Sequence, residues 1–288
     1  MLSAANFELL SAALMPTEDI RDCLNESFSD YLISLPKFDD AGWQMFLRRQ
    51  GIDLSLSLVG VRDNRVMSFS LVSPRGIDRW RIAVMGARPI ARGTGIAARL
   101  LDETIAAAAR LDLRGVELEV FAQNARALRL YQSRGFVALC ALHGYEAVAG
   151  TCGGQHQVSS VSVDEAACWA LAFERDHATS LPWQVGGDAL RAVPGSPVCL
   201  RLEGAQIVYS EATGAVTVLS LLDLDPEYRA AVALLDMLRA SFPEAILRAP
   251  QLQAQHGPAI AFLKAGWVQH GLYQLLMRRD FAEMGESC

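Results

Sequence analysis

Lysine is almost missing from this chain, since only Lys37 and Lys264 among its 26 basic residues are lysines. Its six cysteines form no Cys-x-x-Cys pair, which argues against a zinc site and is typical of free thiols in a reducing cytosol. No apolar run approaches the roughly 20 residues that a membrane span needs. The N-terminus has no basic region before its apolar part, unlike a secretory signal. We therefore expect a cytoplasmic protein with no metal site and no membrane contact.

An excess of positive charge is lacking as well. Residues 1–150 carry 17 basic and 17 acidic side chains, whereas residues 151–288 carry 9 and 15, which together produce the net charge of −6. An acidic chain without a basic stripe is poorly suited to a phosphate backbone, so we expect no nucleic-acid partner. The length of 288 residues, 51% of them hydrophobic, is sufficient for two domains.

Apolar periodicity and turn residues predict a mixture of strands and helices in the first half of the chain. We expect strands at 7–14, 54–61, 66–72, 80–87, 116–121 and 136–142. We expect helices at 19–31, 41–49, 96–110 and 125–134. The predicted fold class is therefore α/β, more closely α+β.

One glycine-rich turn, Arg92-Gly93-Thr94-Gly95-Ile96-Ala97, opens the helix expected from Ile96. Glycine lets the backbone pass close to a bulky anion because no Cβ intervenes. The helix that follows directs its unsatisfied N–H groups and the positive end of its dipole toward that anion. The turn thus predicts a pyrophosphate site.

A dinucleotide fold is the alternative interpretation, because Gly93-x-Gly95-x-x-Ala98 also fits G-x-G-x-x-A. Glu117 or Glu119 stands near the place of the acid that binds the ribose in that fold. In a dinucleotide fold, however, the first glycine follows directly on a buried strand. Here the segment 88–92 intervenes, and its Pro89 cannot donate to a central ladder.

A second block, after one helix and one strand, favours a different family. It reads Asn-x-x-Ala-x-x-x-Tyr-x-x-x-Gly-Phe, with Asn124, Ala127, Tyr131, Gly135 and Phe136. Together with Arg92, Gly95 and Ala97 in the pattern Arg/Gln-x-x-Gly-x-Gly/Ala, it resembles the GNAT superfamily of acetyl-coenzyme A-dependent N-acetyltransferases. The resemblance covers about residues 60–140. It implies a mixed, mostly antiparallel twisted sheet flanked by helices.

The resemblance also implies a reaction and its site. An acetyl group would pass from acetyl-coenzyme A to a primary amine, of a small molecule or a peptide, through a tetrahedral intermediate. Coenzyme would be bound by Met85, Gly86 and Ala87, by residues 92–97 and by Asn124, which also fits an N-cap. Tyr131 falls on the family's general acid, although a packed aromatic is the plainer interpretation. Tyr31, Trp43 and Asp53 lie in the segment that usually shapes the acceptor pocket.

Glu117 and Glu119 are candidates for the general base. The period of two in a strand places both on one face. If the strand is central, two covered carboxylates imply a polar cleft, and burial would suit proton abstraction through a water. Alternatively, the two glutamates are solvated or structurally paired, and no dedicated base exists.

The small residues of 149–156 predict a linker between domains 1–148 and 157–288. In the second domain, residues 225–238 and 259–267 repeat the two blocks weakly. No glycine stands in the turn after Arg229, and Phe262 replaces the tyrosine. We therefore expect tandem GNAT-like domains, the second degenerate, with one coenzyme per chain, as monomer or homodimer. A non-catalytic coenzyme A-binding regulatory or scaffold protein is the alternative function.

Overall fold

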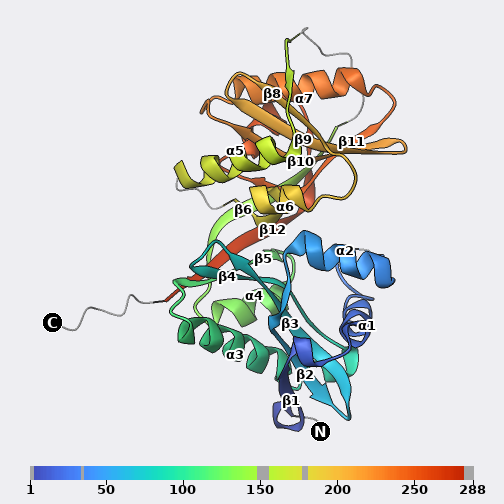
Figure 1. The fold of residues 1–288 in the computed structure, drawn as a ribbon, viewed down its shortest axis with the longest axis vertical. Coiled ribbons are helices and arrows are strands. Elements are labelled where there is room, and N and C mark those ends of the chain that lie inside the picture. Colours follow the sequence, from blue (N-terminus) through green and yellow to red (C-terminus); the bar gives the residue numbers. More distant parts are fainter. Residues whose placement is uncertain (1–2, 34–35, 148–155, 177–180, 282–288) are drawn as a thin grey trace, which may run out of the picture. The chain divides into compact units, whose positions relative to one another are not determined.

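The computed structural model describes residues 3–33, 36–147, 156–176 and 181–281, and it divides into two compact units (Figure 1). The first unit is Met1–Ala138 together with Met277–Cys288, and the second is Leu139–Leu276. No helix among the described residues is both long enough and apolar enough to cross a bilayer.

The first unit is built on a mostly antiparallel sheet. Its helices are α1 (Thr17–Ser27), α2 (Asp40–Gln50), α3 (Ile96–Arg110) and α4 (Ala125–Gln132). Its strands are β1 (Glu8–Ser11), β2 (Asp53–Arg62), β3 (Arg65–Arg75), β4 (Arg79–Ala87) and β5 (Gly115–Phe121), in that order across the sheet. Neighbouring strands are antiparallel except β4 and β5, which are parallel. Short 3₁₀ turns lie at Ala4–Asn6, Ala12–Leu14 and Pro89–Ala91.

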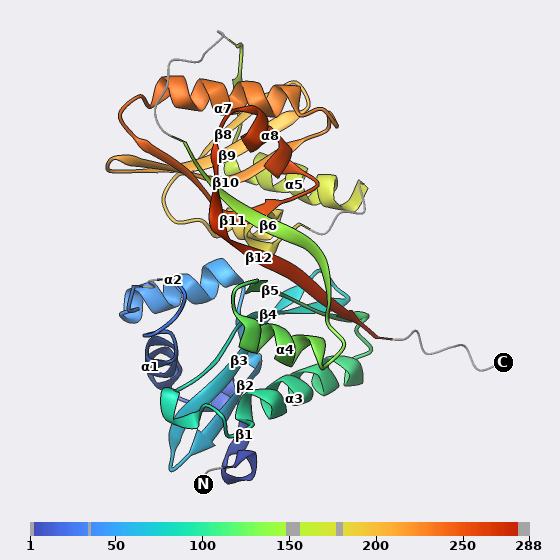
Figure 2. The same cartoon turned by 180° about the vertical axis from the view of Figure 1, so that it is seen from behind.

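Both faces of this sheet are covered by helices, with α1 and α2 on one side and α3 and α4 on the other (Figure 2). One buried cluster joins Ile20 of α1 and Trp43 of α2 to Phe69 of β3. A second cluster joins Ile96 and Leu100 of α3 to residues of the opposite face. This double covering explains why β3 is almost continuously buried rather than alternating.

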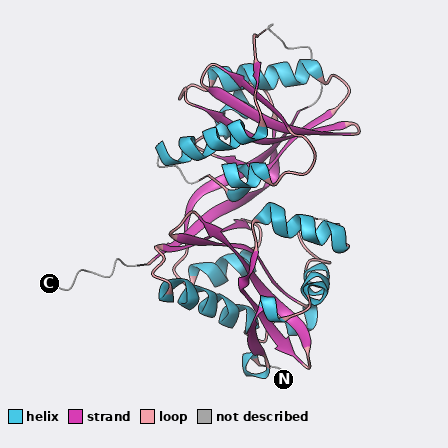
Figure 3. Ribbon diagram, in the orientation of Figure 1, coloured by secondary structure: helices cyan, strands magenta, loops and turns pink. Residues whose placement is uncertain are grey.

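The second unit repeats the layered arrangement of strands and helices (Figure 3). Its strands are β7 (Ser159–Ser160), β8 (Val198–Leu202), β9 (Ala205–Ala212), β10 (Ala215–Asp223) and β11 (Ile246–Ala254), with most of β6 (Val137–Ala147) and β12 (Val268–Asp280). Its helices are α5 (Val163–Asp176), α6 (Gly187–Arg191), α7 (Arg229–Ser241) and α8 (Pro258–Lys264), with a 3₁₀ turn at Trp183–Val185. One core packs beneath α7 and α8, and another beneath α5 and α6.

The order of elements predicted for the first unit is confirmed, but the division of the chain differs from the predicted domains. Most of the predicted linker 149–156 lies outside the described residues. The units divide between residues 138 and 139, inside β6, and residues 277–288 belong to the first unit. There Phe281 N donates to Arg114 O at 2.8 Å. Strand β12 has 13 residues, which is long enough for its two ends to belong to different units. Hydrophobic periodicity alone does not reveal such a division of one strand.

Candidate functional site

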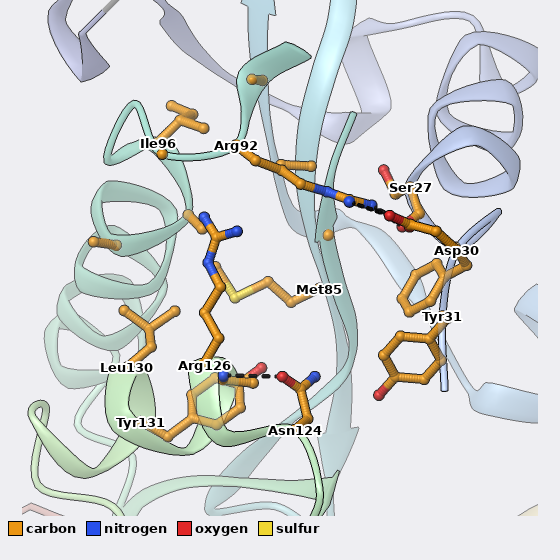
Figure 4. Close-up of a pocket in the computed structure, with 18 of the residues that line it drawn as sticks. Ser27, Asp30, Tyr31, Met85, Arg92, Ile96, Asn124, Arg126, Leu130 and Tyr131 are labelled. Atoms are coloured by element: carbon orange, nitrogen blue, oxygen red, sulfur yellow. Dashed lines mark hydrogen bonds and ion pairs between the residues drawn. The ribbon is translucent and has the colours of Figure 1, made fainter. Parts of the chain in front are cut away.

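A cavity of about 740 Å³ opens in the first unit where β4 and β5 separate (Figure 4). The two strands are in register only from Arg79 opposite Gly115 to Ile82 opposite Leu118. Beyond that point β4 remains paired with β3 on its other edge, from Met85 to Ala87. One edge of β4 is therefore left facing the cavity rather than β5.

The cavity brings together most of the residues that the sequence singled out. They are Met85, Gly86, Ala87, Arg92, Gly93, Gly95, Ile96, Ala97, Asn124 and Tyr131. Thr94 is not in the lining. Its hydroxyl donates to Ala91 O at 2.7 Å and accepts from Ile96 N at 3.3 Å, so it shapes the turn before α3. Ser27, the last residue of α1, and residues just after the helix, such as Phe28 and Asp30, complete the lining and were not predicted.

The turn before α3 has the backbone that an anion site requires. Gly93 and Gly95 have φ values of 79° and 89°, in the left-handed region that favours glycine. A Cβ added to Gly93 would meet nothing within 4 Å, so the space beside it is open. Helix α3 begins at Ile96, and the N–H groups of its first turn have no partners within the helix. An anion in the cavity would approach these groups.

Arg92 is already held by a carboxylate in this structure. Its Nη1 and Nη2 donate to the two oxygens of Asp30 at 2.6 and 2.7 Å, and Nη2 also donates to Ser27 O at 2.9 Å. Both side chains line the cavity and face each other in Figure 4. The Arg92 guanidinium lowers the pKa of the Asp30 carboxyl, mainly through the hydrogen bond. Sequence gave no sign of this pair, because nothing in it indicates that α1 ends beside the turn.

Gly86 matters for a reason that differs from the sequence argument. A Cβ on Gly86 would lie 2.7 Å from Phe69 Cζ and 3.2 Å from Ser27 Cβ. Such distances are shorter than ordinary van der Waals contact, so a side chain here would push α1 away from the sheet. The small residue thus seats α1 against β4, and through α1 it places Asp30 at the cavity.

Tyr131 lies in the last turn of α4, 8% exposed, and lines the cavity. Burial raises the pKa of its phenol, and the nearby Tyr31 raises it further. Asn124 begins the same helix, and its Oδ1 accepts from Ala127 N at 3.1 Å. Asn124 is therefore the N-cap that the plainer interpretation proposed, while its side chain also lines the cavity. Burial raises the pKa of Tyr31, and a hydrogen bond with Asn124 opposes that shift.

Glu117 and Glu119 occupy one face of β5, but they are paired with arginines. The two carboxylate oxygens of Glu117 bind Arg75 Nε at 3.0 Å and Arg278 Nη2 at 3.1 Å. Glu119 Oε2 binds Arg81 Nε at 2.8 Å. Neither glutamate is in the cavity lining. In this structure both glutamates are structurally paired, which was one of the alternatives left open, and buried carboxylates need such compensating cations.

A second cavity, of about 310 Å³, shares Phe28 and Tyr31 with the first. Its other lining residues are Leu24, Asn25, Ser29, Ile33, Pro36 and Lys37. The Phe28 and Tyr31 rings meet edge to face at 4.9 Å, and Tyr31 also contacts Phe121. Of the three residues expected near an acceptor, Tyr31 therefore lies between the cavities. Trp43 is core, with its Nε1 donating to Thr17 Oγ1 at 2.7 Å.

Comparison with known proteins identifies the domain that carries this cavity. Residues 17–136 match the model of the acetyltransferase (GNAT) family. No curated protein sequence matches the chain.

Solved structures resemble the chain over nearly its whole length. A GCN5-related N-acetyltransferase from Sphaerobacter thermophilus is 14% identical with a TM-score of 0.65, covering 97% of each chain. Another, from Anabaena variabilis, is 14% identical with a TM-score of 0.65, covering 95% of this chain and 72% of its own. One from Kribbella flavida is 14% identical with a TM-score of 0.61, covering 96% and 72%. At this identity the likeness concerns the fold.

Proposed function

Since the chain belongs through residues 17–136 to the acetyltransferase (GNAT) family, whose members use acetyl-coenzyme A, we propose that it acetylates a primary amine by direct attack on the thioester. One observation carries this proposal. Two motifs about thirty residues apart, the turn at 92–97 and the block from Asn124 to Tyr131, line a single cavity where two parallel strands separate.

The cavity fits the coenzyme at both of its ends. The turn with Gly93 and Gly95 and the N-terminus of α3 offer N–H groups and a dipole to a diphosphate. The edge of β4 from Met85 to Ala87 offers backbone groups to the amides of the pantetheine arm, because β5 has left that edge. A backbone N–H at this edge would also stabilise the oxyanion, an effect commonly worth about 2.7–4 kcal/mol.

The reaction needs one nucleophile and one proton donor. The neutral amine attacks the carbonyl carbon, a C–N bond forms, and the tetrahedral intermediate then expels the thiolate as the C–S bond breaks. Tyr131 supplies the proton that the thiolate takes. Its raised pKa keeps the phenol protonated at neutral pH. The proton lost by the attacking nitrogen passes to water, and the phenolate recovers its own proton from the same solvent.

We propose that Glu117 and Glu119 are not the general base. Both oxygens of Glu117 and Oε2 of Glu119 are already bound to arginines, and both residues lie outside the cavity lining. The amine therefore reacts from the fraction that is already neutral in solution. This fraction rises with pH, so the reaction should be faster in mildly alkaline solution.

The competing function is coenzyme binding without turnover, in a regulatory or scaffold protein. Tyr131 argues against it, because a binding module needs no phenolic proton donor in the lining of the cavity.

A thiol-release assay with acetyl-coenzyme A and a panel of amines separates the two. The panel should include amino acids, polyamines, aminoglycosides and peptide N-termini. If the protein is a catalyst, thiol release should depend on the presence of one class of amine. Tight coenzyme binding in calorimetry, with no amine-dependent thiol release for any class, would favour the scaffold function.

A further inference from the structure

The end of α1 connects the anion-binding turn to the second cavity. Asp30, which binds Arg92 through both carboxylate oxygens, lies between Phe28 and Tyr31 in the sequence. Phe28 and Tyr31 are the residues that the two cavities share. A movement of the backbone at Asp30 would therefore also move Phe28 and Tyr31, which separate the two cavities.

The carboxylate of Asp30 stands where it opposes an incoming phosphate. It accepts two hydrogen bonds from the guanidinium of Arg92, and its negative charge offsets the positive charge of that side chain. A phosphate, like a carboxylate, accepts two parallel N–H hydrogen bonds from a guanidinium, so both anions suit the same donors. A diphosphate near Arg92 would also repel Asp30 directly. The two anions cannot both be held there without cost.

Resting on the proposed function, we propose that Asp30 is a positioning residue that makes the second cavity respond to the coenzyme. When a diphosphate binds the turn at 92–97, it displaces Asp30 from Arg92. The segment 27–31 is then released, and Phe28 and Tyr31 rearrange at the partition. The shape of the second cavity then depends on whether the turn at 92–97 holds a diphosphate.

The contacts around Asp30 make this exchange inexpensive. Its side chain is 60% exposed and that of Arg92 is 29% exposed, so the pair is screened by water and contributes little to folding. The segment is also held by Arg92 donating to Ser27 O, a bond that would weaken with the same movement. A weak ion pair is what an exchangeable contact requires, because a strong one would exclude the coenzyme.

Asp30→Asn tests the inference, with Asp102→Asn as the matched control. Asp102 also binds an arginine through both oxygens, with Arg134 Nε at 3.0 Å and Nη2 at 3.3 Å, and it is 54% exposed. Both changes remove one negative charge from the same unit, but Asp102 is not in either cavity lining. Thermal melting of both variants would establish that each remains folded.

Calorimetry with coenzyme A gives the first readout. Asp30→Asn should bind coenzyme A about two- to five-fold more tightly than wild type in low salt, and the gain should shrink as salt rises. Asp102→Asn should bind like wild type. Binding by Asp30→Asn that is equal to, or weaker than, that of the control would overturn the inference.

Hydrogen exchange with inorganic pyrophosphate gives the second readout. Pyrophosphate engages the turn without filling the rest of the cavity. In wild type it should raise the exchange of the amides at 28–31, whereas in Asp30→Asn that exchange should be high beforehand and change little. Equal responses in the two proteins would refute the coupling. If wild type binds no coenzyme A at all, the proposed function fails as well, so the two failures are distinct.

Discussion

The turn before α3 and the turn before α7 hold equivalent places in two similar frameworks, but their chemistry is opposite. In each unit a strand leads through a left-handed residue into a helix, and a parallel strand follows. Before α3 the left-handed residues are Gly93 and Gly95, and the space beside Gly93 is open. Before α7 the left-handed residue is Tyr228, with φ of 56°.

The second turn contains its own anion. Asp223, 5% exposed at the end of β10, accepts from Ala231 N in the first turn of α7 at 2.9 Å and from Asp225 N at 2.8 Å. The Asp223 carboxylate thus satisfies backbone amides at the start of α7. At the start of α3 we propose that a phosphate satisfies the equivalent amides. A helix N-terminus thus becomes a ligand site only where the protein leaves its amides unsatisfied.

The helices after the parallel strands show the same divergence. In both units the helix ends in a left-handed glycine, Gly135 or Gly266, followed by a buried aromatic. Phe136 N donates to Tyr131 O at 3.2 Å, and Trp267 N donates to Phe262 O at 2.9 Å. The backbone is therefore repeated. Phe262, however, is fully buried and stacks on Tyr145 at 4.9 Å, with no proton to offer.

Tyr131→Phe should produce the largest effect and would test the difference between the two helices. Losing the phenolic proton should reduce kcat and kcat/KM together by about 10²–10⁴, the range of general acid catalysis. Coenzyme affinity should hardly change. Tyr145→Phe, in the second unit, is the control, because it also removes one buried hydroxyl but should leave the rate as it was. A rate within a few-fold of wild type would reduce Tyr131 to a packing residue.

Gly95→Asp should weaken coenzyme binding by at least about 100-fold. The new side chain is strained at φ of 89° and brings a negative charge to the anion, and juxtaposed like charges cost several kcal/mol. Gly214→Asp is the matched control, because Gly214 also has positive φ, 74°, with nothing near its Cβ, but lies in the second unit. Titration should find one coenzyme per chain in wild type and in the control. Two equivalents, or unchanged affinity in Gly95→Asp, would contradict the comparison.

Asp223→Asn should lower the free energy of unfolding by about 1–2 kcal/mol. The change removes a charge that favours the positive end of the α7 dipole and weakens a cap. Urea denaturation measures the loss, and Glu211→Gln, at an exposed position, should change it by less than about 0.5 kcal/mol. The number of coenzymes bound should remain one. Binding of a second coenzyme in Asp223→Asn would show that the carboxylate alone closes that turn.

The smallest effect concerns pH. Because the folded pKa of Tyr131 is raised, its phenol stays protonated beyond its ordinary value of about 10. With acetyl-coenzyme A saturating, kcat/KM for the amine should rise with pH as the amine loses its proton and should show no descending limb up to about pH 10. A descending limb between pH 7 and 9 that disappears in Tyr131→Phe would refute the proposed state of this phenol.

Local sequence was enough to predict much of the first unit. Periodicity predicted the order of its elements, and the glycines at 93 and 95 predicted a turn whose backbone an anion can approach. The structure adds that both glycines are left-handed, which few other residues tolerate without strain. Glu117 and Glu119 were also rightly placed on one face of β5. A structural pairing was one of the alternatives for them, but their partners could not be named, since Arg278 lies 161 positions from Glu117 in the chain.

Sequence by itself therefore determined the motifs, their local backbone and the class of chemistry. These properties depend on residue type and short spacing, which the chain states directly. Tertiary structure decided which polar groups already have partners: Asp30 on Arg92, Asp223 on the α7 amides, and arginines on the two glutamates. Pairing depends on distances between elements, and packing sets those distances. The same packing separates β4 from β5 and so creates the cavity between motifs that sequence could only list in order.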